Sequence, residues 1–155
     1  MHRRNLIEAS PTFDPTDPEG FRSGMLRLGP AMGAQLTGAT MYEIPPGEAL
    51  CPYHYEYGEE EWLLVLAGRP TVRTPEGAEQ LAPNDLVFFP RGPVGAHQVR
   101  NDGDETVRVL MWSNVTLPTV SAYPDSGKVG VWTGDDAEDL IVERAHGVGY
   151  YHGEA

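Results

Sequence analysis

Short apolar runs separated by turn residues recur along this chain, and that rhythm limits its fold more than any other feature. The 18 glycines and 14 prolines lie largely between runs of Val, Leu, Phe and Tyr. Short strands broken by turns every eight to twelve residues are typical of a β-sandwich or β-barrel. The pattern therefore predicts an all-β fold with little helix and strands at about 25–28, 35–44, 50–56, 61–67, 70–74, 85–89, 95–100 and 106–113.

The 155 residues are enough for one domain with a substantial core and leave little for a second. Residues 1–24 carry Pro11, Pro15 and Pro18 among polar residues, so we expect an irregular N-terminal arm there. We expect the β-barrel domain over 25–117. Residues 118–155 are expected to form a C-terminal extension with a possible last strand over 140–144.

The formal net charge of −12 argues against nucleic acid and anionic membranes as partners, because both need a clustered basic face. Small molecules, a metal cation or a second copy of the chain are the expected partners. No apolar run approaches the roughly 20 residues that span a bilayer, and no apolar segment follows Arg3 and Arg4, so a cytoplasmic location is expected. With Cys51 as the one cysteine, an internal disulfide and a cysteine-based metal cluster are excluded.

An imidazole and several carboxylates cluster beside one predicted strand. Alternate side chains of a strand share a face, so His54 and Glu56 are expected to point the same way. Glu61 shares parity with apolar Leu63 and Val65, and His97 shares parity with Val99. Buried carboxylates are costly unless they are paired, hydrogen-bonded or bound to a cation. The inward candidates for a mononuclear metal site are therefore His54, Glu56, Glu61 and His97.

Other polar and aromatic residues have simpler interpretations. Glu59 and Glu60 are expected to be solvated turn residues, and Glu56 alone could equally pair with a basic group or a tyrosine hydroxyl. Tyr53 and Tyr55 have the parity opposite to His54, which favours packing on the outer face or a dimer surface over substrate contacts. A sheet whose outward positions are Trp62, Leu64 and Leu66 would expose an apolar strip, so we expect a homodimer.

Two segments between about Gln35 and Leu117 resemble the motifs of the cupin superfamily. The first cupin motif runs from a glycine through His-x-His and a glutamate to a second glycine, matched here by Gly47, His54, Glu56, Glu61 and Gly68. The second motif, from a glycine through Pro-x-Gly and a histidine to an asparagine, is matched by Asn84, Pro90, Gly92, His97 and Asn101.

This resemblance implies a double-stranded β-helix, which is a small jelly-roll barrel. It also implies that the metal ligands are His54, Glu56, Glu61 and His97. Glu56 stands where the family usually has its second histidine, and Asn84 replaces a glycine. Short insertions precede His54 and His97. A set of two histidines and two carboxylates favours Mn, Fe or Zn over Cu.

The implied function is binding or conversion of a small organic molecule at a mononuclear divalent-metal site. An enzyme of this kind would be an isomerase, a lyase or a dioxygenase. The alternative is a non-catalytic cupin that binds a small ligand and has a degenerate or structural metal site. Because the fold carries enzymes and binding proteins alike, the sequence leaves open whether turnover occurs and assigns no catalytic residue.

Overall fold

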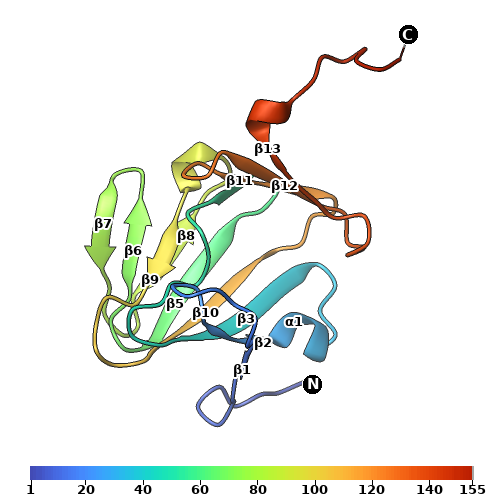
Figure 1. The fold of residues 1–155 in the computed structure, drawn as a ribbon. Coiled ribbons are helices and arrows are strands. Elements are labelled where there is room, and N and C mark those ends of the chain that lie inside the picture. The colour runs from blue at the N-terminus through green and yellow to red at the C-terminus, as the bar shows by residue number, and fades with distance from the viewer. Residues whose placement is uncertain (155) are drawn as a thin grey trace.

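Two layers of antiparallel strands enclose the core in a computed structural model that describes residues 1–154 (Figure 1). The first layer is a six-stranded sheet in the order β1-β2-β3-β10-β5-β8. Its strands are β1 (Thr12–Phe13), β2 (Gly24–Arg27), β3 (Thr37–Ile44), β10 (Val107–Asn114), β5 (Glu61–Ala67) and β8 (Leu86–Phe89).

The second layer consists of two smaller sheets in the orders β7-β6-β9 and β13-β12-β11-β4. Its strands are β4 (Tyr55–Glu56), β6 (Thr71–Thr74), β7 (Gly77–Gln80), β9 (Gln98–Arg100), β11 (Thr119–Tyr123), β12 (Lys128–Trp132) and β13 (Leu140–Glu143). Residues 49–56 join the two sheets, because Ala49 pairs with Arg100, His54 pairs with His97, and β4 pairs with β11.

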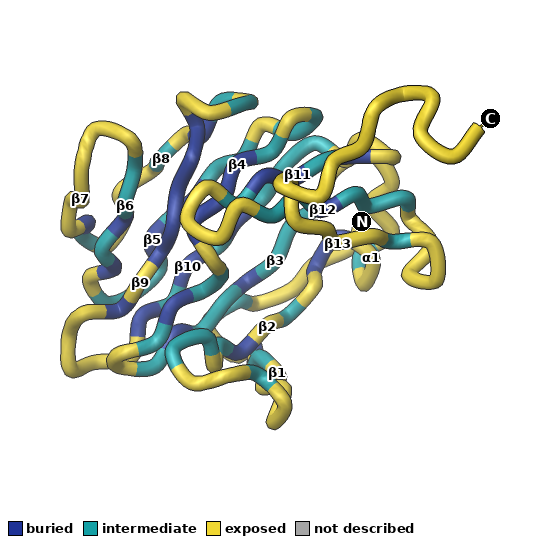
Figure 2. Tube along the Cα trace, turned by 45° about the horizontal axis from the view of Figure 1, so that its top comes forward, coloured by how far each residue is buried: buried dark blue, intermediate teal, exposed yellow. Residues whose placement is uncertain are grey.

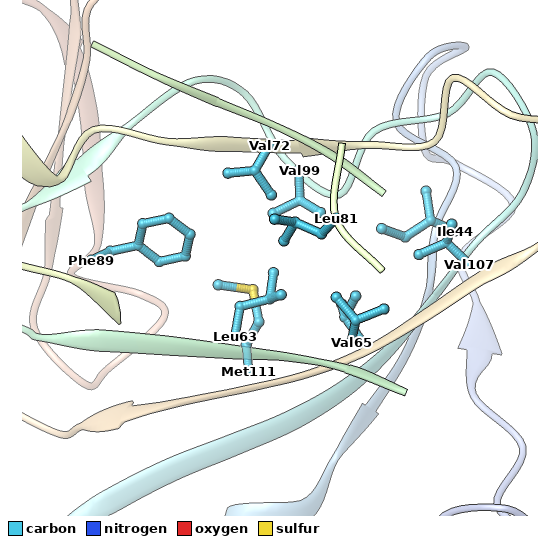
Figure 3. Packing of buried hydrophobic residues seen from close by; sticks show 10 residues of the cluster. Ile44, Leu63, Val65, Val72, Leu81, Phe89, Val99, Val107 and Met111 are labelled. Carbon is cyan, nitrogen blue, oxygen red and sulfur yellow. The ribbon is translucent and has the colours of Figure 1, made fainter. Parts of the chain in front are cut away.

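The main core lies between the two layers (Figure 3). Each strand contributes alternate side chains to it, as the period of two requires. The cluster consists of Ile44, Leu63, Val65, Val72, Leu81, Phe89, Val99, Val107, Val109 and Met111. Val99 and Leu63 belong to this core, so the faces of the chain on which they lie point inward. His97 has the same parity as Val99, and Glu61 the same parity as Leu63, so both also face the interior.

The expected all-β architecture is confirmed, and helix is scarce. The helical elements are α1 (Leu28–Ala31) and the 3₁₀ turns η1 (Pro93–Gly95) and η2 (Arg144–His146). Within residues 1–154, no helix has the length and apolar character needed to cross a membrane.

Each predicted strand of the barrel has a counterpart: β5 has the bounds expected for the strand over 61–67, and the others have shifted ends. The strand expected over 50–56 is regular only at its end, in β4, and the one expected over 95–100 is shortened because η1 occupies its start. β1, β7, β11 and β12 were not predicted from the sequence. All four residues of β7 are exposed, so this strand has no buried apolar face. In β11 and β12 the apolar alternation is short, Val120 with Ala122 and Val129 with Val131, and the opposite, inward positions include Ser121 and Gly130.

The N-terminal arm covers part of the outer face of the six-stranded sheet. Ala9, Leu28 and Met41 are buried together there, with Leu66 and Leu110 packed against them. The Arg108 guanidinium fastens the arm by donating to the Ala9 carbonyl at 2.7 Å and to Glu43 at 2.9 Å. Leu66, expected on an exposed strip, is therefore covered by the chain itself. The segment after β12 is largely exposed, as the yellow tube shows (Figure 2).

The motif residues at the turns adopt the backbone that their identity allows. Gly47, Gly68 and Gly92 have φ of 79°, 74° and 78°, and Asn84 has φ of 74°. Asparagine tolerates this left-handed region better than most residues, which explains how it can stand in place of a glycine. Asn101 is buried and donates to the carbonyls of Ile44 and Glu105, both at 2.8 Å, so it ties the turn before β10 to the end of β3.

Candidate metal site

His54 and His97 are brought together by a single pair of residues in the second layer. The His54 amide donates to the His97 carbonyl at 3.1 Å, and the His97 amide donates to the His54 carbonyl at 2.8 Å. Residues that exchange both hydrogen bonds across antiparallel chains project their side chains to the same face. The two imidazole rings accordingly lie with their centroids 4.8 Å apart.

Backbone carbonyls select the same tautomer in both rings. Nδ1 of His54 lies 3.0 Å from the Pro52 carbonyl, and Nδ1 of His97 lies 3.0 Å from the Gly95 carbonyl. A carbonyl can only accept, so each Nδ1 carries the proton and each neutral ring keeps a lone pair on Nε2. This arrangement is common among metal-ligating histidines, whose second nitrogen is anchored by a carbonyl or carboxylate.

The insertion before His97 has a structural purpose. It forms η1, whose last residue, Gly95, supplies the carbonyl that His97 contacts. A Cβ at position 95 would collide with the Pro90 carbonyl, so the turn requires glycine there. Phe89 stacks on the His97 ring with centroids 3.7 Å apart and planes 10° apart, which fixes the ring against the main core.

Glu61 faces the two histidines from β5 in the opposite layer. Its Oε2 lies 3.4 Å from Nε2 of His97 and 4.0 Å from Nε2 of His54. The three ligand atoms all lie within 4.8 Å of one another. The Nε2 atom of His97 is fully buried and has no hydrogen-bond partner among the described residues. An unpartnered acceptor aimed at a carboxylate is costly unless a proton or a cation lies between them.

Burial keeps these groups neutral when no cation is bound. It lowers the pKa of His97 to about 3, with a further contribution from His54, and it also lowers the pKa of His54. Burial raises the pKa of Glu61 to about 8, and the nearby charges of Glu56 and Glu59 raise it further. Desolvation alone therefore leaves two neutral imidazoles and a protonated Glu61. A bound cation would instead favour the ionised form of the Glu61 carboxyl group.

Glu56 lies beside this cluster and is held by β11. Glu56 pairs with Ser121 across the β4–β11 ladder, and the Ser121 hydroxyl lies 2.7 and 2.8 Å from the two carboxylate oxygens. The nearest Glu56 oxygen is 3.8 Å from Nε2 of His54. Burial raises the pKa of Glu56, and the hydrogen bond from Ser121 opposes that shift.

A cavity of about 240 Å³ opens beside the cluster between β3, β10 and residues 50–54. His54 and Glu61 lie in its wall, together with Tyr42, Cys51 and Ser113. Burial raises the pKa of Tyr42 to about 12 and also raises that of the Cys51 thiol, so both groups stay protonated at neutral pH. The cavity therefore offers hydroxyl donors beside the histidine and carboxylate ligand atoms.

The predicted site residues are placed as follows. Of the four, His54, Glu61 and His97 form the tight group, and Glu56 is their neighbour. Tyr53 and Tyr55 are buried in a small cluster with Ala96 and Ala122, so they pack within the chain. Sequence reasoning missed Ser121 and Trp132, which lie close to Glu56, because both come from the segment beyond the recognised motifs and neither forms part of a ligand pattern.

The donor set fits a divalent cation. Both imidazoles present an unprotonated Nε2, the buried His97 nitrogen has no partner, and a carboxylate with an exposed side-chain fraction of 20% completes the group. Nitrogen and oxygen ligands of this kind suit Mn, Fe and Zn.

Comparison with known proteins identifies the domain that carries these residues. Residues 40–113 match the family model of the cupin domain. That span includes His54, Glu56, Glu61 and His97, but it ends before β11 and β12. No curated protein has a sequence that matches this chain.

Among solved structures, this chain resembles a protein from Acidithiobacillus ferrooxidans that carries the provisional name sugar phosphate isomerase. The two are 27% identical, with a TM-score of 0.81 over 93% of this chain and 91% of the other. A sugar phosphate isomerase of the cupin superfamily from Silicibacter pomeroyi has the same TM-score of 0.81 at 21% identity, over 94% of each chain.

The polyketide cyclase RemF from Streptomyces resistomycificus shares the fold at a TM-score of 0.60 and 22% identity, over 74% of this chain and 79% of its own. The fold is therefore compatible with different chemistry, and the reaction has to be argued from the site.

Proposed function

We propose, from the cupin domain matched over residues 40–113, that the chain is a metal-dependent enzyme of the isomerase type that acts on a small hydroxycarbonyl compound such as a sugar or sugar phosphate. The observation that carries the proposal is the His54–Glu61–His97 group, in which a buried imidazole nitrogen without a partner faces a carboxylate. The resemblance to the Acidithiobacillus ferrooxidans protein favours isomerisation over the lyase and dioxygenase alternatives.

In this proposal His54, Glu61 and His97 hold a divalent ion, with Glu56 as a fourth ligand. Mn, Fe or Zn are the candidates. Such an ion would supply a Lewis acid for a substrate carbonyl oxygen and would make an adjacent hydroxyl more acidic.

The other residues of the cavity would bind and orient the substrate. The protonated Tyr42 hydroxyl and the Ser113 hydroxyl, which lie in the cavity wall, are suited to hydrogen bonds with substrate oxygens. The volume of about 240 Å³ suits a molecule of a few carbon atoms, with a longer substrate extending through the mouth. The buried setting strengthens each of these polar contacts relative to bulk water.

The test begins with tag-free protein purified without chelator, in which Mn, Fe, Co, Ni, Cu and Zn are measured per chain. The same preparation is incubated in D₂O with aldoses, ketoses and their phosphates and followed by proton NMR. We expect near-stoichiometric metal, together with interconversion that is lost after chelation and restored by added ion. The interconversion would identify isomerisation, and exchange of the hydrogen next to the substrate carbonyl would show that it proceeds by proton transfer.

Bound metal without turnover of any of these compounds would contradict the isomerase proposal. It would instead support a cupin that binds a small ligand without converting it. Absence of metal, even after incubation with excess ion, would remove the proposed metal site. The neutral state that burial imposes on Glu61 and His97 would then describe a polar pocket that needs no ion.

We also propose that the chain forms a homodimer in the cytoplasm and that neither nucleic acid nor membrane is a partner. The dimer is supported by an aromatic row on the outer face of the six-stranded sheet. Trp62 stacks on Trp112 with planes 3° apart and contacts Phe88, whose exposed fraction is 41%. Sedimentation velocity should give a dimer, and Trp62→Glu should shift it to a monomer without loss of the folded state.

A further inference from the structure

A row of three residues crosses the second layer next to the metal site. Glu56 of β4 is paired with Ser121 of β11, which in turn is paired with Gly130 of β12. Directly paired residues of antiparallel strands lie on the same face, so Ser121 and Gly130 share the face from which Glu56 reaches the site. Ser121 is 1% exposed, so its hydroxyl must find its partners inside the protein.

The hydroxyl of Ser121 is bonded on both sides. Nε1 of Trp132 donates to it at 2.6 Å, and the indole nitrogen can only donate. Ser121 therefore accepts from Trp132 and has its own proton free for Glu56, whose oxygens lie 2.7 and 2.8 Å away. One hydroxyl proton serves one oxygen at a time, which leaves the other carboxylate oxygen available for another contact.

Gly130 makes room for this arrangement. A Cβ at position 130 would lie 3.0 Å from Cζ2 and 3.3 Å from Nε1 of Trp132, closer than side chains normally approach. With glycine there, the indole lies over its own strand and reaches Ser121. A small residue, an indole and a hydroxyl on neighbouring strands therefore combine to hold a single carboxylate.

We propose that Ser121 and Trp132 are positioning residues that orient Glu56 as the fourth ligand of the metal site. This inference rests on the proposed function, because it assumes that a metal ion occupies the site. A carboxylate on a flexible side chain has more freedom than an imidazole, so it needs an external hydrogen bond to be directed at a metal. The nearest Glu56 oxygen lies 3.8 Å from Nε2 of His54, a separation similar to the 4.0 Å between Glu61 and the same nitrogen.

The consequence is that the metal site depends on the strands beyond the matched cupin domain. The family match ends at residue 113, while Ser121 and Trp132 lie on β11 and β12. Hydrogen-bond partners of metal ligands affect metal affinity by about 10- to 100-fold when they are removed. We therefore expect Ser121→Ala to weaken metal binding by that factor, and Trp132→Phe to weaken it less because the hydroxyl remains.

The test is titration of the full-length, chelator-stripped protein with Co²⁺, whose visible absorption reports the number and type of its ligands. Ser121→Ala, Trp132→Phe and Glu56→Gln should each bind Co²⁺ more weakly than the parent and with an altered spectrum. Ser121→Thr keeps the hydroxyl and should restore binding. Circular dichroism of each variant checks that it is folded. If Ser121→Ala is not folded, Trp132→Phe replaces it as the test variant.

A matched control is available on the same strand. Thr119 lies two residues from Ser121, is also buried, and its hydroxyl has no hydrogen-bond partner among the described residues. Thr119→Val therefore removes a buried hydroxyl from the same face of β11 without touching Glu56, and it should bind Co²⁺ like the parent. A loss equal to that of Ser121→Ala would show a general effect of disturbing β11 and would overturn the positioning role.

The outcomes separate this inference from the proposed function. Parent-like Co²⁺ affinity and spectrum in Ser121→Ala or in Glu56→Gln would overturn the inference, while a parent that binds metal and isomerises substrate would leave the proposed function intact. The expected Co²⁺ results in a protein that converts no substrate would support the inference and contradict the isomerase. A parent that binds no Co²⁺ would overturn both.

Discussion

The ring nitrogens of His54 and His97 have different partners on their two sides. Each Nδ1 is held by a backbone carbonyl, whereas each Nε2 faces the carboxylate of Glu61. The carbonyls are part of the fold and are present whether or not an ion is bound. The two histidines are therefore already in the protonation state and orientation that ligation needs, so binding a cation costs little rearrangement.

Replacing His97 with alanine removes the most buried of the proposed ligands. We expect His97→Ala to lose most of its bound metal, with an affinity at least about 10-fold below the parent. Elemental analysis of parent and variant, purified in parallel without chelator, measures the loss. Unchanged metal content would contradict the ligand assignment.

Glu56→His restores the residue that cupins usually have at this position. It exchanges an oxygen donor for a nitrogen donor, so the variant should fold and shift its preference from Mn toward softer ions such as Cu. Competition between Mn²⁺, Zn²⁺ and Cu²⁺ for the stripped proteins, measured by elemental analysis after gel filtration, gives the preference. A variant that binds none of them, while the parent does, would mean that the site accepts only a carboxylate there.

At the scale of elements, the turns and the strand ends place the site, and glycines at fixed positions shape those turns. Gly68 follows β5, the strand that carries Glu61, and its backbone passes so close to β10 that a Cβ would lie 2.9 Å from Cα of Val107. Gly47 has a similar positive φ, but a Cβ there would meet nothing within 4 Å. Comparing substitutions at the two glycines therefore separates the energetic cost of a positive φ from the energetic cost of steric crowding.

Gly68→Ala and Gly47→Ala form a matched pair. Each should lose about 1–2 kcal/mol of unfolding free energy, because alanine is disfavoured in the left-handed region. Gly68→Ala should lose more, since its Cβ also displaces the start of β10. Urea denaturation of both variants measures the difference. Equal losses would mean that β10 relaxes without cost.

The sequence predicted the parts of the fold that have regular patterns. Glu61, placed by its parity with Leu63 and Val65, faces the site from β5, and Asn84 adopts the positive φ expected of a glycine substitute. β11 and β12 were missed because Ser121 and Gly130 occupy inward positions where an apolar residue identifies a strand. Ser121 is explained by its hydrogen bond to Glu56, 65 residues away, and Gly130 by the indole of Trp132 that lies over it, and both contacts become visible only in three dimensions. The boundaries at residues 24 and 117 remain predictions.

For the whole molecule, the buried site makes stability depend on pH in two opposite ways. Burial raises the pKa of Glu61 from 4.5 to about 8, so the folded chain retains a proton that the unfolded chain releases. Stability from this group is complete below about pH 4.5 and falls as the pH rises to about 8. Burial lowers the pKa of His97 from 6.5 to about 3, so its contribution falls as the pH drops through that range.

Between pH 6 and pH 8 the loss from Glu61 exceeds the gain from the histidines, whose ordinary pKa of 6.5 lies at the lower end of the interval, so the metal-free protein should be more stable at pH 6. Glu61→Gln cannot ionise, so it should lose most of this difference, and a bound divalent ion should also remove it by stabilising the ionised carboxylate. Urea midpoints of the chelated parent, the metal-loaded parent and the variant at both pH values measure the effect. The histidines titrate alike in both proteins, so a chelated parent whose midpoint changes between pH 6 and pH 8 in the same way as that of Glu61→Gln would contradict the burial of an ionisable Glu61.

Residues 49–56 have neighbours on both sides, at β9 and at β11. A shortened protein that stopped after β10 would leave the β4 side of this segment with free backbone amides and carbonyls. Unpaired strand edges are templates for pairing with other chains and promote aggregation. Expression of residues 1–114 alone should therefore yield insoluble or self-associated protein, so biochemical work on the proposed metal site should retain β11 and β12.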